Sequence, residues 1–242
     1  MKKITLITGA GRGIGFEVAK LFASKNENLI LTVRKKSQIK EVNKIKKMYD
    51  SNIRVFVGDL NNLNFIKKIG NQVKLVNTIV NNASGENQKY FTEVTEKDLN
   101  NMINVNLVAN FMLTKIFVKK MIKKKIKGNV INLGSQLGHM GAHNRSIYCM
   151  VKFGIEGLTK SLAMDLGKHG IRVNSVSPTK TIVNSSENKS SKRLNLIKKK
   201  IPLGKFSTTQ EIANIVYFLT TSSAASITGT SIISDGGWTA GK

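Results

Sequence analysis

The chain has 242 residues, of which 40% are hydrophobic, so it is long enough to bury a sizeable core in one large α/β domain or in two small ones. Its formal net charge of +25 raises nucleic acid or an anionic membrane as partners, but no zinc-finger spacing or aromatic-interleaved basic motif accompanies the lysines. The single cysteine, Cys149, excludes an internal disulfide, and no uninterrupted apolar run is long enough for a membrane-spanning helix.

The lysines are spread along the chain together with many Asn and Ile residues. We interpret them mainly as solvated helix faces, as in segment 115–128, with attraction of anionic substrates or partners as the alternative. We therefore expect no membrane partner and no nucleic-acid partner.

Apolar strand-like runs alternate with helical patterns along the chain. The opening run MKKITLITGAG passes directly into a glycine-rich turn without a cleavage site, so we read it as a strand and expect a cytoplasmic protein that starts at Met1. The alternation predicts a single doubly wound α/β domain over 1–242, whose parallel sheet is covered on both faces and binds ligands beyond the carboxyl ends of its strands. The predicted strands are 4–8, 29–33, 53–58, 78–82, 128–134, 171–178 and 231–236.

A glycine-rich turn follows the first predicted strand and opens a helix. Glycines there allow positive φ angles and a close approach of the backbone to a phosphate, which the free N–H groups of the helix would bind. The spacing fits T-G-x-x-x-G-x-G rather than G-x-G-x-x-G, and we expect a cofactor site; a turn without a ligand is the alternative. The run is Thr8-Gly9-Ala10-Gly11-Arg12-Gly13-Ile14-Gly15.

The second predicted strand ends without the acidic residue that would hold a ribose 2′-hydroxyl. Arg34 and Lys35 stand there instead and could pair with a 2′-phosphate, which favours NADP(H) over NAD(H). Surface cations in a lysine-rich chain are the alternative explanation.

Polar residues also follow the third and fourth predicted strands. Asp59, before Leu60, could accept from an adenine amino group or cap the following helix. The fourth strand runs into Asn82, Ala83 and Ser84. Each of these signals is weak by itself.

Ser135 follows the fifth predicted strand, and Tyr148 and Lys152 form a Y-x-x-x-K pattern further on. On a helix the two side chains would share one face, one turn apart. An ammonium group near the phenol favours phenolate and would lower the tyrosine pKa toward a useful acid–base range. A Tyr/Lys pair of this kind also occurs on ordinary helices.

Taken together, these residues resemble the short-chain dehydrogenase/reductase family over essentially the whole chain. The residues that carry the resemblance are TGAGRGIG at 8–15, Asp59, Asn-Asn-Ala at 81–83, Asn106, Ser135, Tyr148 and Lys152. The resemblance implies a Rossmann-type fold with seven parallel strands, and an enzyme that transfers hydride between a nicotinamide and a carbonyl or alcohol.

The same resemblance implies roles for individual residues. Tyr148 would be the general acid or base, and Ser135 would orient the substrate carbonyl. Lys152 would bind the nicotinamide ribose and lower the tyrosine pKa, and Asn106 would hold a relay water. Asn82 and Ala83 would contact the adenosine half and Asp59 the adenine, while the segment after Pro178 would close over the nicotinamide.

Four positions depart from the family pattern. Ser84 and Thr179 stand where Gly is usual, and Val151 replaces a small or hydroxyl residue. Val183 stands where a threonine often contacts the carboxamide, a contact that Thr181 could supply instead.

Three variable segments should decide the substrate: 84–95, 136–147 and a lid at about 179–203. His139, His143 and Arg145 could meet a polar or anionic substrate or simply be solvated, and no spaced partner set predicts a metal site.

The chain resembles both the 3-oxoacyl-carrier-protein reductases, whose acyl-thioester substrate sits on an acidic carrier protein, and the sugar or polyol dehydrogenases. A catalytically inactive nucleotide- or nucleic-acid-binding protein is the alternative from another class. The family is usually tetrameric or dimeric, and apolar positions on 104–122 and 152–166 could form a homotetramer or homodimer interface or belong to the core.

Overall fold

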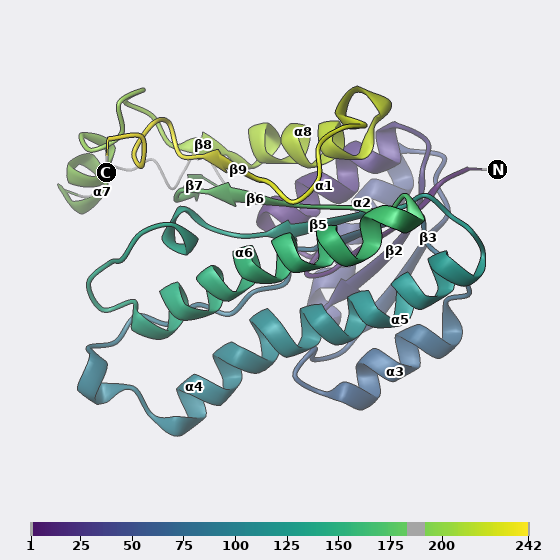
Figure 1. The fold of residues 1–242 in the computed structure, drawn as a ribbon, viewed down its shortest axis with the longest axis horizontal. Helices are drawn as coiled ribbons and strands as arrows, with labels where there is room; N and C mark the ends of the chain where they lie inside the picture. The colour runs from purple at the N-terminus through teal and green to yellow at the C-terminus, as the bar shows by residue number, and fades with distance from the viewer. Residues whose placement is uncertain (1, 183–191, 242) are drawn as a thin grey trace.

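The computed structural model describes residues 2–182 and 192–241 and contains a parallel seven-stranded sheet in the order β3-β2-β1-β4-β5-β6-β9 (Figure 1). All seven predicted strands are confirmed, each to within a few residues at its ends. A smaller pair, β7 (Thr181–Ile182) and β8 (Ser207–Thr208), lies beside the main sheet. The main strands are β1 (Ile4–Ile7), β2 (Asn28–Val33), β3 (Ile53–Val57), β4 (Thr78–Asn81), β5 (Asn129–Leu133), β6 (Arg172–Pro178) and β9 (Ser231–Ser234).

Helices cover both faces of the sheet, as a doubly wound fold requires (Figure 1). One core cluster joins the sheet to α1 (Gly13–Ser24), α2 (Ile39–Met48) and α8 (Thr209–Thr220). The second cluster joins the opposite face to α3 (Leu63–Gln72), α5 (Ala109–Lys123) and α6 (Ser146–Leu166). Two further helices, α4 (Glu96–Ile103) and α7 (Lys192–Lys198), lie toward the carboxyl ends of the strands.

Helix α1 shows how the sequence pattern produces this packing. Its buried side chains include Val18, Phe22 and Ala23, which recur on one face of the helix. Phe22 is fully buried, and its ring lies edge-on to the ring of Tyr217 on α8 with the centroids 5.2 Å apart. This packing holds α1, the helix that the glycine-rich turn opens, against the sheet and α8.

Helices α4 and α5 join through a π-helical turn, Asn104–Val108, into one continuous helix over Glu96–Lys123. By length and composition alone this helix could cross a membrane, although polar and charged residues interrupt its apolar sequence. Its side chains Leu113, Phe117 and Met121 are fully or almost fully buried in the core. Core helices of soluble proteins can have the same length and apolar composition, so this helix is weak evidence for a membrane span.

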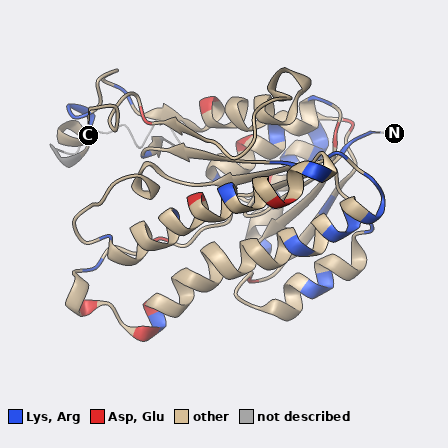
Figure 2. Ribbon diagram, in the orientation of Figure 1, with Lys and Arg blue, Asp and Glu red and all other residues tan. Residues whose placement is uncertain are grey.

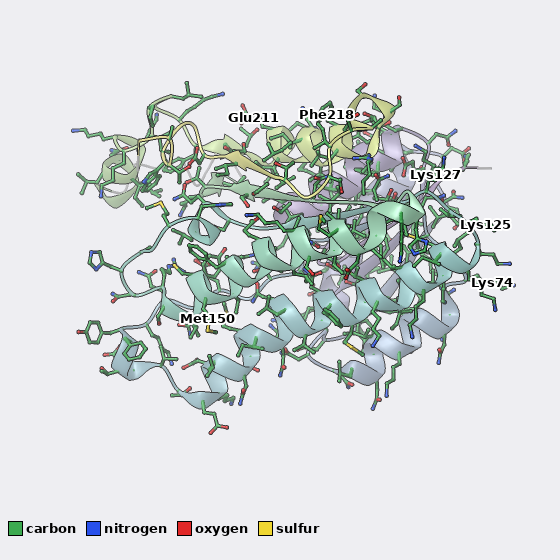
Figure 3. The ribbon with its side chains drawn as sticks, viewed as in Figure 1. Lys74, Lys125, Lys127, Met150, Glu211 and Phe218 are labelled. Atoms are coloured by element: carbon green, nitrogen blue, oxygen red, sulfur yellow. The ribbon has the colours of Figure 1, made fainter. Side chains whose placement is uncertain are left out.

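Lysines and arginines gather around the amino-terminal ends of the strands (Figure 2). Lys74, Lys125 and Lys127 lie at this end with exposed side chains (Figure 3). These lysines are solvated and lie far from the carboxyl ends of the strands, in agreement with their interpretation as solvated surface, while other basic residues, such as Arg145 and Lys180, line the cavity at the opposite end.

Candidate active site

A cavity of about 800 Å³ opens beyond the carboxyl ends of β1, β4, β5 and β6, where the doubly wound fold predicts a ligand. Residues from segments far apart in the sequence meet in its wall. They include Arg12, Ile14, Asn82, Ser84, Ser135, Tyr148, Lys152, Pro178 and Thr181.

The glycine-rich turn is fastened to the end of β4 by a set of hydrogen bonds. Thr8 Oγ1 accepts from the backbone N–H groups of Asn82 and Ala83, both at 2.9 Å. Asn82 Nδ2 donates in return to the carbonyl oxygens of Thr8 at 2.8 Å and Gly9 at 3.2 Å. These bonds hold the turn in one shape at the edge of the cavity.

The glycines of this turn are required by its geometry. Gly9 and Gly13 have φ angles of 67° and 58°, and a Cβ on Gly9 would lie 3.0 Å from Ala83 Cα. In the described structure, Arg12 at the start of α1 makes no side-chain cap and the first turn holds no acidic residue. The free backbone N–H groups in the first turn of α1 can therefore bind an anion. The glycine-rich turn and the start of α1 thus fit the phosphates of a dinucleotide.

The ends of β2 and β3 lie outside the cavity wall. Arg34 Nη2 is 3.1 Å from Asp59 Oδ2, so these two predicted cofactor residues pair with each other. Gln38 was not predicted: its Oε1 accepts from the N–H groups of Arg34 at 3.0 Å and Lys35 at 3.1 Å. Its position within a short 3-10 turn after β2 gave no sequence signal for this contact.

Leu60, which directly follows Asp59, is a predicted cofactor contact whose side chain belongs to a core cluster. A contact with the cofactor through its backbone stays a prediction.

Tyr148 and Lys152 lie one turn apart on α6, as the Y-x-x-x-K spacing predicts. The Tyr148 phenol makes a hydrogen bond with the Ser135 hydroxyl. Lys152 is almost fully buried; its Nζ donates to the Leu133 carbonyl oxygen at 2.8 Å and lies 5.7 Å from the centroid of the Tyr148 ring. The structure thus brings these three residues together at the end of β5.

The predicted lowering of the Tyr148 pKa by Lys152 is not what the structure shows. Burial raises the pKa of the Tyr148 phenol, while the hydrogen bond with Ser135 and the charge of Arg145 oppose that rise. Burial also lowers the pKa of Lys152 to about 8, against the opposing effect of Glu156. Because burial disfavours charge on both groups, the two pKa shifts favour the neutral phenol of Tyr148 and the neutral amine of Lys152.

Asn106 lies in the π-helical turn between α4 and α5, a type of turn that often marks a functional site. Its Nδ2 donates to the Met102 carbonyl oxygen at 2.9 Å, and its Oδ1 accepts from Ser84 Oγ at 2.7 Å. Ser84, which departs from the family's usual glycine, therefore has a partner of its own in the site.

Glu156 was not predicted, although it lies one helical turn beyond Lys152. Its buried carboxylate accepts hydrogen bonds from Ser175 Oγ at 2.5 Å and Ser177 Oγ at 2.7 Å. His139 Nε2 lies 3.4 Å from the same carboxylate and 3.1 Å from Ser231 Oγ. His139 thus contacts the protein framework, whereas Arg145 lines the cavity and His143 is exposed.

The segment after Pro178 borders the cavity through Thr179, Lys180 and Thr181. Thr181 Oγ1 donates to the Thr179 carbonyl oxygen at 3.1 Å. Val183 and the rest of 183–191 lie outside the described residues. Leu194 and Ile197, which fall within the predicted lid at 179–203, lie in the same wall together with Trp238, which was not predicted as a site residue. Within the described ranges no group of three His, Cys, Asp or Glu side chains could hold a metal ion.

Comparison with known proteins agrees with this geometry. The family model described as enoyl-(acyl carrier protein) reductase matches residues 9–239. A 3-oxoacyl-acyl-carrier-protein reductase of Buchnera aphidicola subsp. Schizaphis graminum is 32% identical over 240 residues, covering 98% of this chain and 97% of that protein. The corresponding reductase of Aquifex aeolicus is 33% identical over 247 residues, with 97% and 96% covered.

Solved structures share the fold. A 4-hydroxyisoleucine dehydrogenase complexed with NADH superposes with a TM-score of 0.93 at 30% identity, and all of both chains is covered. Acetoin dehydrogenase from Salmonella typhimurium superposes with a TM-score of 0.89 at 27% identity, with 98% of this chain and 96% of that chain covered. The chain therefore belongs to the short-chain dehydrogenase/reductase family, and it is an oxidoreductase that acts on carbonyl or alcohol groups with a nicotinamide cofactor.

Proposed function

We propose that the chain is a cytoplasmic reductase that uses NADPH to reduce the 3-oxo group of an acyl thioester carried by an acidic carrier protein. The observation that carries this proposal is the set of Ser135, Tyr148 and Lys152 at the end of β5, in a chain about 30% identical over nearly its whole length to 3-oxoacyl-acyl-carrier-protein reductases. The intact set also argues against a catalytically inactive binding protein.

The buried phenol is the acid in the proposed reaction. Ser135, hydrogen-bonded to Tyr148, orients the carbonyl oxygen, and Tyr148 donates its O–H proton to that oxygen in reduction or accepts it back in oxidation. Because burial raises the pKa of Tyr148, the phenol stays protonated at neutral pH and is ready to donate. The nicotinamide, when bound, supplies the hydride.

Lys152 and Asn106 support this proton transfer. Lys152 lies beside the Tyr148 ring and holds its ammonium near the end of β5, where it would bind the nicotinamide ribose. Asn106 would hold the relay water, and the Ser84 hydroxyl, which donates to its Oδ1, fixes the orientation of the amide.

The cofactor preference rests on Arg34. Its pair with Asp59 is exposed, and exposed ion pairs contribute only about 0–1 kcal/mol, so Arg34 is easily released to a 2′-phosphate. The rest of the dinucleotide would be held by Thr8, the glycines of the turn, Arg12, Asn82 and Ala83. NAD(H) is the alternative, and the solved relative with NADH shows that the fold accepts it.

We further propose assembly into a homotetramer or homodimer. Four apolar side chains on α5 and α6 are 45–84% exposed, and they are Phe111, Met150, Phe153 and Met164 (Figure 3 labels Met150). An exposed apolar surface of this kind is typical of an interface between copies.

A substrate panel with purified protein and NADPH tests the function. Acetoacetyl thioesters should be reduced, and sugars, polyols and diketones should react poorly or not at all. Turnover of sugars or polyols alone would replace the proposal with a sugar or polyol dehydrogenase. Absence of turnover with every carbonyl compound would leave a binding protein.

A further inference from the structure

Arg145 is a charged side chain in the cavity wall that influences the pKa of Tyr148 but neither gives nor takes the transferred proton. It lies directly before α6 and three residues before Tyr148, and it lines the cavity together with Ser84, Ser135 and Tyr148. Only 18% of its side chain is exposed. A guanidinium so largely buried needs hydrogen-bond acceptors. The chemistry of its acceptors in the protein indicates which ligand group could replace one of them.

The loop after β4 holds this guanidinium in place. Nη1 donates to the Asn87 carbonyl oxygen at 3.1 Å, and Nη2 donates to Gln88 Oε1 at 3.1 Å. The guanidinium carbon lies 5.7 Å from the centroid of the Tyr148 ring. Arg145 is therefore fixed beside the reacting phenol.

A carboxylate already occupies one position on this guanidinium. Glu86 Oε1 lies 2.9 Å from Nη1, and Glu86 also lines the cavity. Its side chain is 73% exposed, so it can turn into water without losing a buried environment. The Asn87 and Gln88 contacts would remain to hold Arg145 while a different carboxylate replaced Glu86.

We propose that this site also takes a small oxo acid or hydroxy acid, whose carboxylate displaces Glu86 and binds Arg145 while its carbonyl or hydroxyl group meets Ser135 and Tyr148. Arginine suits this role because its planar fork matches a carboxylate with two parallel hydrogen bonds. Lys180 in the same wall adds a second positive charge.

The reduction would consume one hydride and one proton. The carbonyl carbon would gain the hydride that a bound NADPH supplies, the C=O π bond would break, and its oxygen would take the proton of the Tyr148 hydroxyl. The phenolate would regain a proton from water, so that the products are a hydroxy acid and the oxidised cofactor. The inference rests on the proposed hydride transfer and not on the acyl-thioester substrate.

The test compares free oxo acids with their uncharged methyl esters, with the keto group two, three or four carbons along the chain. For at least one spacing, the wild-type protein should have a kcat/KM about 10-fold or more higher for the acid than for its ester. Arg145→Met should lower the acid-to-ester ratio by about 10–100-fold, the range for a lost hydrogen bond to a charged group. Glu86→Gln should lower KM for the acid, because it removes the competing carboxylate.

Two further variants keep the result interpretable. Arg145→Lys retains the charge without the fork and should recover part of the ratio. Arg54→Met removes an arginine that pairs with Gln72 on the outside of the fold and should leave the ratio unchanged. Thermal unfolding and NADPH titration establish that each variant is folded.

The outcomes separate this inference from the proposed function. An acid-to-ester ratio near one in the wild type, or the same ratio in Arg145→Met, overturns the oxo-acid assignment. Turnover of thioesters and esters alone overturns it too and leaves the proposed function standing. Failure to reduce any carbonyl compound overturns both.

Discussion

The hydrogen bonds of Thr8, which fasten the glycine-rich turn to the end of β4, should also stabilise the fold. In Thr8→Val the Ala83 N–H loses its acceptor, whereas the Asn82 N–H keeps the Val80 carbonyl oxygen at 3.1 Å. Thr8 is 3% exposed, so water does not readily replace the hydroxyl. A buried donor left without a partner costs about 1–3 kcal/mol, and we expect the free energy of unfolding to fall by that amount because the isosteric methyl keeps the packing.

Urea unfolding followed by circular dichroism at one fixed protein concentration measures this loss. With a denaturant slope of about 3 kcal/mol/M, the midpoint should fall by about 0.3–1 M. Thr8→Ser keeps the hydroxyl and is the matched control, which should lie within about 1 kcal/mol of the wild type. A Thr8→Val midpoint equal to that of the wild type, or a Thr8→Ser midpoint as low as that of Thr8→Val, would refute the role assigned to these hydrogen bonds.

Tyr148→Phe should lower kcat by about 10²–10⁴-fold while NADPH affinity, measured by fluorescence titration, changes little; unchanged kcat would contradict its role as acid. Arg34→Ala should weaken NADPH binding by about 10-fold or more and NADH binding far less, with Lys36→Ala as control; equal losses would contradict the 2′-phosphate contact. Lys152 has a folded pKa of about 8 against 10.5, so between pH 8 and 10 the unfolded chain binds more protons and stability should rise with pH. Relative to Lys152→Met, the free energy of unfolding measured in urea should rise by up to about 2 kcal/mol between pH 8 and 10. Parallel pH profiles of the two proteins would contradict a lowered pKa of a buried Lys152.

The alternation of β-branched runs with amphipathic helices was enough to predict the sheet, because central strands such as β4 are buried on both faces, which favours apolar residues along most of their length. The places of Ser135, Tyr148 and Lys152 were equally predictable. They follow from one strand end and one helical turn, both of which are local properties of the sequence.

Contacts between segments far apart in the chain could not be predicted from the sequence. The bond from Ser84 to Asn106 depends on how the loop after β4 meets the π-helical turn, and the pairing of Arg34 with Asp59 depends on the choice of rotamer at two strand ends. The pKa of Lys152 could not be predicted for a related reason. Its spacing from Tyr148 indicates proximity, but only the fold shows how completely both groups are withdrawn from water.

The gathering of lysines around the amino-terminal ends of the strands has a consequence for how this chain tolerates change in its composition. A strand such as β6, Arg172–Pro178, spans about 23 Å at roughly 3.3 Å per residue. Salt at physiological concentration screens exposed charges over about 8 Å, so strands of this length separate the two ends of the sheet by more than two screening lengths. Lysines at the amino-terminal end, such as Lys74, Lys125 and Lys127, can therefore be gained or lost with little effect on the electrostatic potential in the cavity, which nearby groups such as Arg145, Glu86 and Lys180 set.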